Sequence, residues 1–308
     1  MNTITLDSSF IEIPEKMFYG KNIDIVILPV ECKKICRYAF YNSTIKQIIM
    51  PGVDTIEDFA FSNCKFTEFD TQNVINIGNS VFSNSRLMMC IVRVPTITTE
   101  MFCGCEYLEN VVLSPNVKTI EKYAFHNSSI KNINLENVCN IGHNAFENCN
   151  IKNVNLWSLS EIQNFTFKNC TELMNVFINA KIIGYCAFEN CMSLMELELS
   201  ENLERVKYGA FMNCRLLKFV EFPDSLKRID GFAFAKTQLK EINFSKESKL
   251  KKLGGHVFMG AVCEDIYLPK RLPKFDDNNV ISSFVKKIHI YSTTRYVHTY
   301  GFYNVITK

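Results

Sequence analysis

A phenylalanine that recurs about every 22 residues constrains this chain more than any other feature of its sequence. An aliphatic residue stands five positions before each phenylalanine, from Ile13 to Leu253, and alanine directly precedes most of them. A repeat of this length predicts a solenoid, in which each turn packs only against its neighbours. The twelve positions are Phe18, Phe40, Phe61, Phe82, Phe102, Phe125, Phe146, Phe167, Phe188, Phe211, Phe234 and Phe258.

Each repeat closes with aliphatic residues at the spacing L-x-x-I-x-L, as at Leu194, Leu197 and Leu199. The last two alternate, so they face one side of a short strand. A strand this short is unstable alone, but stacked copies pair into a parallel sheet with one buried face. We expect the preceding I-x-x-x-A-F segment to form a helical turn or an irregular arc on the opposite side, with its isoleucine and phenylalanine in the core.

The whole pattern, I-x-x-x-A-F-x-N-C-x-x-L-x-x-I-x-L-P, resembles the BspA-type leucine-rich repeats, and residues 183–199 match it closely. The resemblance covers roughly residues 10–270. It implies an α/β repeat fold, a curved leucine-rich-repeat solenoid with a parallel sheet and short helical or irregular convex segments. It also implies an interaction role, because many members of the family are surface proteins of bacteria and protists linked to adhesion.

We expect one solenoid domain over residues 1–308, with an N-terminal cap at 1–12, the repeats at 13–268 and a degenerate C-terminal cap at 269–308. Ile4 and Leu6 predict a partial capping strand, and Val285, Ile288 and Ile290 predict a final strand. No segment approaches the ~20 apolar residues of a membrane span. The first residues lack the basic and apolar regions of a signal peptide, which favours a cytoplasmic location. The resemblance offers the cell surface as the alternative.

The thirteen cysteines mostly follow the repeat. We expect the six in its main cysteine position to be buried, reduced thiols stacked between turns. Neighbouring turns about 4.8 Å apart would permit disulfides in this column, but an odd total and the absent export signal argue against them. Two close pairs, Cys32 with Cys36 and Cys103 with Cys105, have no matching partner pair, so no metal site is expected. The six are Cys64, Cys105, Cys149, Cys170, Cys191 and Cys214.

Asparagine follows the phenylalanine by two positions in eight of the twelve repeats. We expect these side chains to be buried and to satisfy backbone groups of adjacent turns. Asn42, Asn127 and Asn169 begin N-x-S/T sequences, but the expected burial argues against their glycosylation. Asn164 and Asn243 lie off the column and would be better acceptors in an exported protein.

The chain carries no signature of an enzyme or of nucleic-acid binding. None of its five histidines lies in an H-E-x-x-H motif, and the glycine-rich phosphate loops and the nucleophile elbow are absent. The net charge of +2 gives no basic footprint for nucleic acid. We therefore nominate no catalytic, metal or cofactor residue and no cofactor; a catalytic site assembled from scattered turns is the third-ranked hypothesis.

Two residues in each predicted strand point away from the core, and these are the candidates for binding a partner. This face begins apolar, turns to asparagine in the middle and ends acidic with isolated aromatics. The candidates are Ile25, Ile27, Ile49, Met89, Ile91, Val112, Phe177, Glu196, Glu198, Phe219, Glu221, Glu241, Asp265 and Tyr267.

The grouping of Ile25, Ile27 and Ile49 in adjacent turns favours a contact surface. Other interpretations are that β-branched residues merely suit strands, and that the acidic end is simply solvated. The leading hypothesis is a protein-binding solenoid, an adhesin or scaffold, whose acidic end steers a basic region of the partner. The alternative is an intracellular structural component whose sheet face is covered by another copy of itself.

Overall fold

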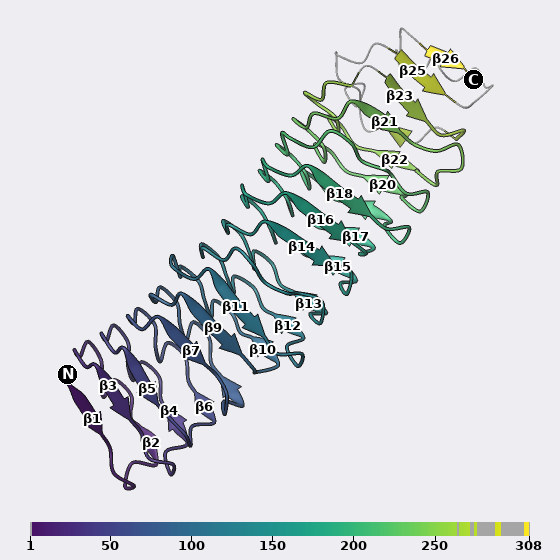
Figure 1. The fold of residues 1–308 in the computed structure, drawn as a ribbon. Helices are drawn as coiled ribbons and strands as arrows, with labels where there is room; N and C mark the ends of the chain where they lie inside the picture. Colours follow the sequence, from purple (N-terminus) through teal and green to yellow (C-terminus); the bar gives the residue numbers. More distant parts are fainter. Residues whose placement is uncertain (1, 264, 272–273, 276–286, 291–304, 308) are drawn as a thin grey trace. The chain divides into compact units, whose positions relative to one another are not determined.

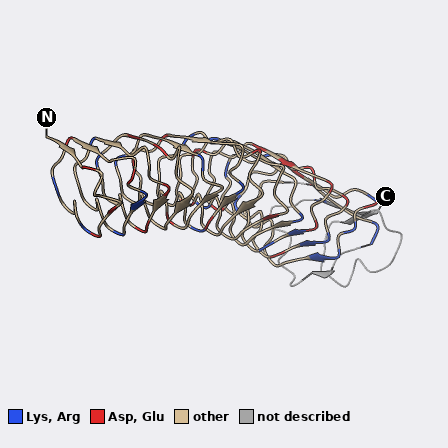
Figure 2. Ribbon diagram, turned by 90° about the horizontal axis from the view of Figure 1, so that it is seen from below, with Lys and Arg blue, Asp and Glu red and all other residues tan. Residues whose placement is uncertain are grey.

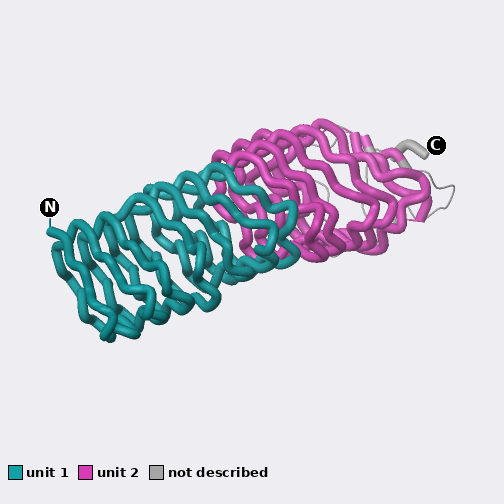
Figure 3. Tube along the Cα trace, turned by 60° about the horizontal axis from the view of Figure 1, so that its bottom comes forward, with its two compact units in different colours: residues 1–151 teal, residues 152–308 magenta. Residues whose placement is uncertain are grey.

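The computed structural model describes residues 2–263, 265–271, 274–275, 287–290 and 305–307. The chain divides into two compact units, unit 1 at 1–151 and unit 2 at 152–308 (Figure 3). Each unit is a parallel β-solenoid, and the chain makes about twelve turns, which confirms the predicted fold. The single domain expected over 1–308 stays a prediction.

Each turn of unit 1 contributes a two-residue back strand that ends at the isoleucine of the repeat (Figure 1). All but one also contribute a front strand from the L-x-x-I-x-L segment; in the last front segment only an isolated bridge forms, between Asn110 and Asn132. The front strands form two parallel sheets, β1–β3–β5 and β7–β9–β11, and the back strands form β2–β4–β6–β8 and β10–β12–β13. The front strands are β1 (Thr3–Thr5), β3 (Ile25–Ile27), β5 (Gln47–Ile49), β7 (Glu68–Asp70), β9 (Met89–Val92) and β11 (Asn110–Leu113). The back strands are β2 (Glu12–Ile13), β4 (Lys34–Ile35), β6 (Thr55–Ile56), β8 (Asn76–Ile77), β10 (Thr96–Ile97), β12 (Thr119–Ile120) and β13 (Asn140–Ile141).

Unit 2 repeats this plan, with front sheets β14–β16–β18 and β21–β23–β25–β26 and one back sheet, β15–β17–β19–β20–β22–β24. Its front strands are β14 (Asn153–Leu156), β16 (Asn175–Ile178), β18 (Glu196–Leu199), β21 (Glu241–Asn243), β23 (Asp265–Leu268), β25 (Lys287–Ile290) and β26 (Val305–Thr307). Its back strands are β15 (Glu161–Ile162), β17 (Ile182–Ile183), β19 (Arg205–Val206), β20 (Arg228–Ile229), β22 (Lys252–Leu253) and β24 (Lys274–Phe275).

Both predicted terminal segments form strands, but the second of them is not the last strand of the chain. The capping strand is β1, which pairs with β3 and includes Ile4 but not Leu6. The strand predicted at Ile288 and Ile290 is β25, and β26 follows it and pairs with it. Val285 lies outside the described residues.

Of the two alternatives expected for the I-x-x-x-A-F segment, the irregular arc is the one that forms, since the described residues contain no helix. The isoleucine ends a back strand, and turns follow it. The reason is a pair of positive φ angles four residues apart in each turn, as at Cys186 (φ 49°) and Asn190 (φ 62°). An α-helix needs negative φ in consecutive residues, so this spacing leaves no room for one.

The asparagine column occupies the second of these two positive-φ positions, and its expected burial is also wrong. Asn42, Asn84, Asn127 and Asn148 are exposed, and the other four are half-buried. Asparagine tolerates the left-handed conformation, as does the glycine that replaces it in three turns. The amides bond to one another between turns; the Asn148 amide donates to the Asn127 oxygen at 2.7 Å. Burial therefore gives no argument against glycosylation in this column.

The predicted phenylalanine core is confirmed. All twelve rings are buried. They stack face to face between turns, so that Phe188 lies between Phe167 (centroids 5.3 Å apart) and Phe211 (5.2 Å). Such stacks add attraction beyond the burial of area.

The predicted cysteine column is also buried. Its thiols donate to backbone carbonyls, as Cys64 Sγ does to Phe40 O at 3.0 Å. Burial raises the pKa of Cys64, Cys105 and Cys149 to about 12. All thirteen cysteines are free thiols.

Candidate functional site

The alternation of burial along the front strands places every predicted partner-binding residue on the outside of its strand or front segment. In β11, for example, Val111 is buried while its neighbours Asn110 and Val112 are exposed. Among the candidates, Ile49, Val112, Phe219, Glu196, Glu198, Glu221 and Glu241 are exposed. The half-buried candidates are Ile25, Ile27, Met89, Ile91, Phe177, Asp265 and Tyr267. Their role in binding stays a prediction.

Strand register brings the apolar candidates of unit 1 together in two groups. Ile27 lies beside Ile49 across β3 and β5. Ile91 lies beside Val112 across β9 and β11. Ile49 and Val112 expose 43% and 52% of their surface. Directly opposed side chains in a sheet are within contact distance, so each group forms a continuous apolar surface.

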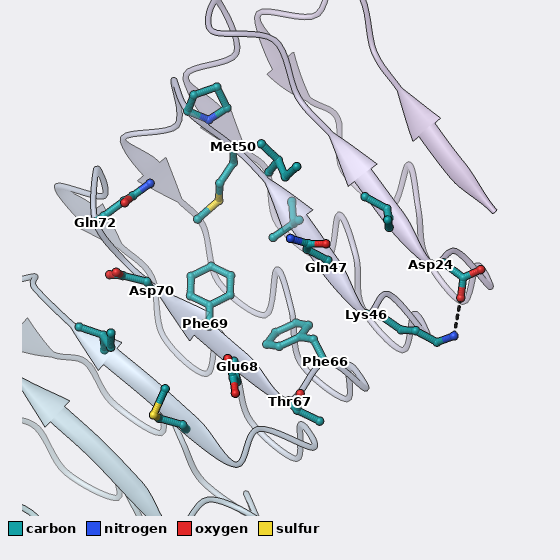
Figure 4. Close-up of a pocket in the computed structure, with 16 residues that line it drawn as sticks. Asp24, Lys46, Gln47, Met50, Phe66, Thr67, Glu68, Phe69, Asp70 and Gln72 are labelled. Carbon is teal, nitrogen blue, oxygen red and sulfur yellow. Dashed lines mark ion pairs between the residues drawn. The ribbon is translucent and has the colours of Figure 1, made fainter. Parts of the chain in front are cut away.

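A groove separates the two groups (Figure 4). We call it the β5–β7 groove; its volume is about 650 Å³. It is lined by Asp24, Ile25, Lys46, Gln47, Ile48, Ile49, Met50, Pro51, Phe66, Thr67, Glu68, Phe69, Asp70, Gln72, Met89 and Ile91. Phe66 and Phe69 are buried at its base, whereas Glu68 reaches solvent. Four predicted candidates therefore meet at one concave site that sequence reasoning did not identify: Ile25, Ile49, Met89 and Ile91.

The groove has a local cause in the sequence. Phe66 and Phe69 occupy two positions that the preceding turn fills with Ile45 and Ile48. Their rings pack against the phenylalanine column: Phe66 lies 5.7 Å from Phe61 and Phe69 lies 4.7 Å from Phe82, between centroids. Close-packed interiors respond to added volume by shifting backbone. We attribute the separation of β5 from β7 to these two rings.

Unit 2 shows the same association at its own break in the front sheet. No strand forms in the front segment between β18 and β21. Phe222 ends this segment, and its ring stacks 4.8 Å from Phe244 between centroids. A phenylalanine directed into the core therefore accompanies these two interruptions. The front segment at residues 130–135 of unit 1 also forms no strand, only a bridge from Asn132 to Asn110, and it contains no phenylalanine.

The groove exposes the edges of two strands. In the paired turns beside it, a backbone amide donates to the carbonyl of the next turn, as Leu28 N does to Ile49 O (2.8 Å) and Thr71 N to Ile91 O (3.1 Å). The corresponding bond from Met50 N to Asp70 O does not form in unit 1, where residues 2–151 are all described. Unpaired strand edges of this kind are templates for another chain.

The charged side chains at the groove differ in whether they are already paired within the chain. Lys46 Nζ contacts Asp24 Oδ1 at 2.6 Å, and the hydrogen bond lowers the pKa of Asp24. Asp70 accepts two bonds from the Arg93 guanidinium at 2.9 and 3.0 Å, which raises the pKa of Arg93. Within residues 2–151, Glu68 has no ion pair. Glu68 is thus the carboxylate that a ligand can meet.

In unit 2, acidic side chains recur on the front strands β18 and β21, and cations recur on the back strands β19, β20 and β22 (Figure 2). The predicted acidic residues, including Glu196 and Glu198, are on the front. The back strands carry Arg205, Arg228 and Lys252 at one repeat position, which sequence reasoning also overlooked. Arg205 and Arg228 both pair with the buried Asp230. The signal was available: a cation directly before the aliphatic residue in three successive repeats.

Two other features are absent from the described residues. They hold no cluster of three or more histidine, cysteine or acidic side chains placed to bind a metal ion. They also contain no helix long and apolar enough to cross a membrane.

The repeats and the solenoid define a class of protein. The family model for the BspA type leucine rich repeat region matches residues 1–89, 95–217 and 181–307. This chain therefore belongs to the BspA-type leucine-rich repeat family, and the predicted resemblance is confirmed. Proteins of this repeat fold generally bind other proteins and typically act as interaction scaffolds.

Solved structures support the fold. A leucine-rich repeat protein from Bacteroides ovatus is similar, with 20% identity and a TM-score of 0.64 over 89% of this chain and 91% of that one. The pneumococcal vaccine antigen PcpA is similar over 100% of this chain and 89% of its own, with 18% identity and a TM-score of 0.52. Comparison with curated proteins finds no match.

Proposed function

We propose that this chain is a non-catalytic protein-binding module, adhesin-like or scaffolding, that holds its partner on the front surface of unit 1. The family and the fold support a protein-interaction role. The observation that carries the choice of surface is the apolar patch of Ile25, Ile27 and Ile49 beside the β5–β7 groove.

The physical reason is the cost of leaving such a patch in water. Burying apolar surface gains about 25 cal/mol per Å² without requiring charge on the partner. Isolated exposed aliphatic residues are ordinary, but adjacent ones next to a concave site mark a contact surface. The acidic front of unit 2 remains a separate prediction, for steering a basic partner.

The test is capture of a partner by the immobilised chain and by the variant Ile27→Lys with Ile49→Lys. Both side chains point outward, so the variant should fold, with circular dichroism and unfolding midpoint unchanged. It should lose at least about tenfold in partner affinity, because two charges would be buried in the contact. The control is Asn134→Lys with Asn155→Lys, which places the same charges in the same outward column and should bind as the parent does.

Two outcomes would contradict the proposal. If the folded Ile27, Ile49 variant retains every partner of the parent, the contact surface lies elsewhere. If the parent retains no protein and instead self-associates with rising concentration, the face serves the assembly of copies of this chain.

A further inference from the structure

We propose that the β5–β7 groove receives an extended segment of the partner, which adds as a strand between β5 and β7. This inference rests on the proposed function and specifies how the partner is held. The added strand would join two front sheets that this chain leaves apart.

The backbone groups that face the groove follow from the bonds already made. In a parallel pair, alternate residues of a strand face alternate neighbours. Gln47 N donates to Asp24 O and Ile49 O accepts from Leu28 N, so the backbone groups of Ile48 face the groove. On the other side, Thr67 O accepts from Met89 N and Thr71 N donates to Ile91 O, so those of Glu68 and Asp70 face it.

An inserted strand would complete both ladders at once. Its amides and carbonyls would bond to Ile48 on one side and to Glu68 and Asp70 on the other. Recognition by strand addition takes its affinity from such main-chain bonds and its specificity from alternate side chains. The volume of about 650 Å³ lies within the range of about 300–1,000 Å³ of ligand pockets, which suits a short segment.

The residues that line the groove determine which side chains the segment needs. Inward-pointing residues would meet the buried rings of Phe66 and Phe69, so they must be small. An outward residue beside Ile49 gains by being aliphatic. The outward residue beside Glu68 gains by being cationic, because Glu68 has no ion pair within residues 2–151 while Asp70 is held by Arg93. In parallel register this order reads cation, small residue, aliphatic.

The probe is a fluorescent pentapeptide with blocked ends and the sequence TKAIT, titrated with the full chain and followed by fluorescence anisotropy. In the proposed register its alanine lies at the level of Ile48 and Phe69 and donates its amide to the Glu68 carbonyl. Methylating that amide nitrogen should weaken binding at least about tenfold, because it removes one ladder bond and leaves a carbonyl unpaired.

A matched pair of variants tests the prediction that Glu68 contacts the cationic residue of the segment. Glu68→Gln, which keeps size and exposure, should weaken binding of the peptide by about threefold to tenfold and flatten its dependence on salt. The same change at Glu198, an outward glutamate of unit 2, should leave the affinity unaltered. A peptide with glutamate in place of lysine should bind the parent chain more weakly than TKAIT.

The results separate this inference from the proposed function. No binding of TKAIT, or equal binding of the methylated peptide, would overturn strand addition. If Ile27→Lys with Ile49→Lys still abolishes partner capture in that case, the proposed function stands without the groove. If the chain self-associates with rising concentration and TKAIT dissociates the assembly, the groove belongs to a second copy, which would also overturn the inference.

Discussion

Replacing Phe188 by alanine removes a ring that is packed on both faces. Phe188 is fully buried, and the rings of Phe167 and Phe211 lie 5.3 and 5.2 Å away between centroids. Burying a phenylalanine side chain is worth about 1.5–3 kcal/mol, and each aromatic pair adds about 0.5–1.5 kcal/mol. Their sum is consistent with the about 3–5 kcal/mol lost in core phenylalanine-to-alanine changes, which is our expectation for Phe188→Ala.

The assay is equilibrium unfolding in urea, with secondary structure and intrinsic fluorescence followed together. Coincident transitions by the two probes are needed, because long repeat arrays can unfold in parts. The control is Phe219→Ala, which removes the same group from a position 64% exposed on the front of unit 2. It should cost under about 1 kcal/mol. A loss below about 1 kcal/mol for Phe188→Ala, or equal losses for both variants, would refute the stacked core.

Three further outcomes follow from the columns of the repeat. Cys149 and Cys214 should resist a bulky thiol reagent in the folded chain and react after denaturation, since both are buried and reduced; rapid labelling without denaturant would contradict this. Burial raises the pKa of Cys149 from its ordinary value of 9.0 to about 12. The stability that its buried, protonated thiol contributes should therefore be complete below pH 9 and be lost as the pH rises toward 12. Unfolding midpoints that do not decrease between pH 9 and 12 would contradict this. Asn190→Ala should lose about 1–2 kcal/mol because φ is 62° there, and Asn190→Gly should lose less, measured by urea unfolding; the reverse order would exclude backbone conformation as the cause.

Much of the fold was predictable because the residue type at each position of the repeat can be compared across twelve turns. The phenylalanine, isoleucine and cysteine columns recur with little change, so chance cannot explain them. The front register was predictable for the same reason, since a shift of one residue would turn every buried aliphatic residue outward. Burial in β11, β14 and β16 follows the predicted alternation.

The conformation of the turns was not predictable in the same way. The first positive-φ position holds Tyr38, Phe59, Glu100 and Cys186 in different turns, so residue type gives no signal there. The asparagine position did carry a signal, because glycine replaces it in three turns, as at Gly104. Alternation of asparagine with glycine indicates a left-handed backbone at this position. That interpretation predicts exposed asparagine side chains, whereas the interpretation based on hydrogen bonding to adjacent turns predicts buried ones.

The groove was not predicted because the residues that cause it fit the pattern of the repeat. Phe66 and Phe69 are apolar residues at apolar positions, so they fit the repeat. Their effect comes from volume, which separates β5 from β7 although the back strands β6 and β8 remain paired. Periodicity reports which side a residue faces; it does not report whether neighbouring turns have room for it.

The most direct test of the account is hydrogen exchange of the backbone amides of the chain with and without its captured partner. Binding at the proposed surface should slow exchange in residues 46–50 and 67–71, where unpaired amides of β5 and β7 face the groove, and leave the back strands β4 and β6 unchanged. Protection confined to the back strands, or to the acidic front of unit 2, would contradict the central claim that this protein binds through the front surface of unit 1.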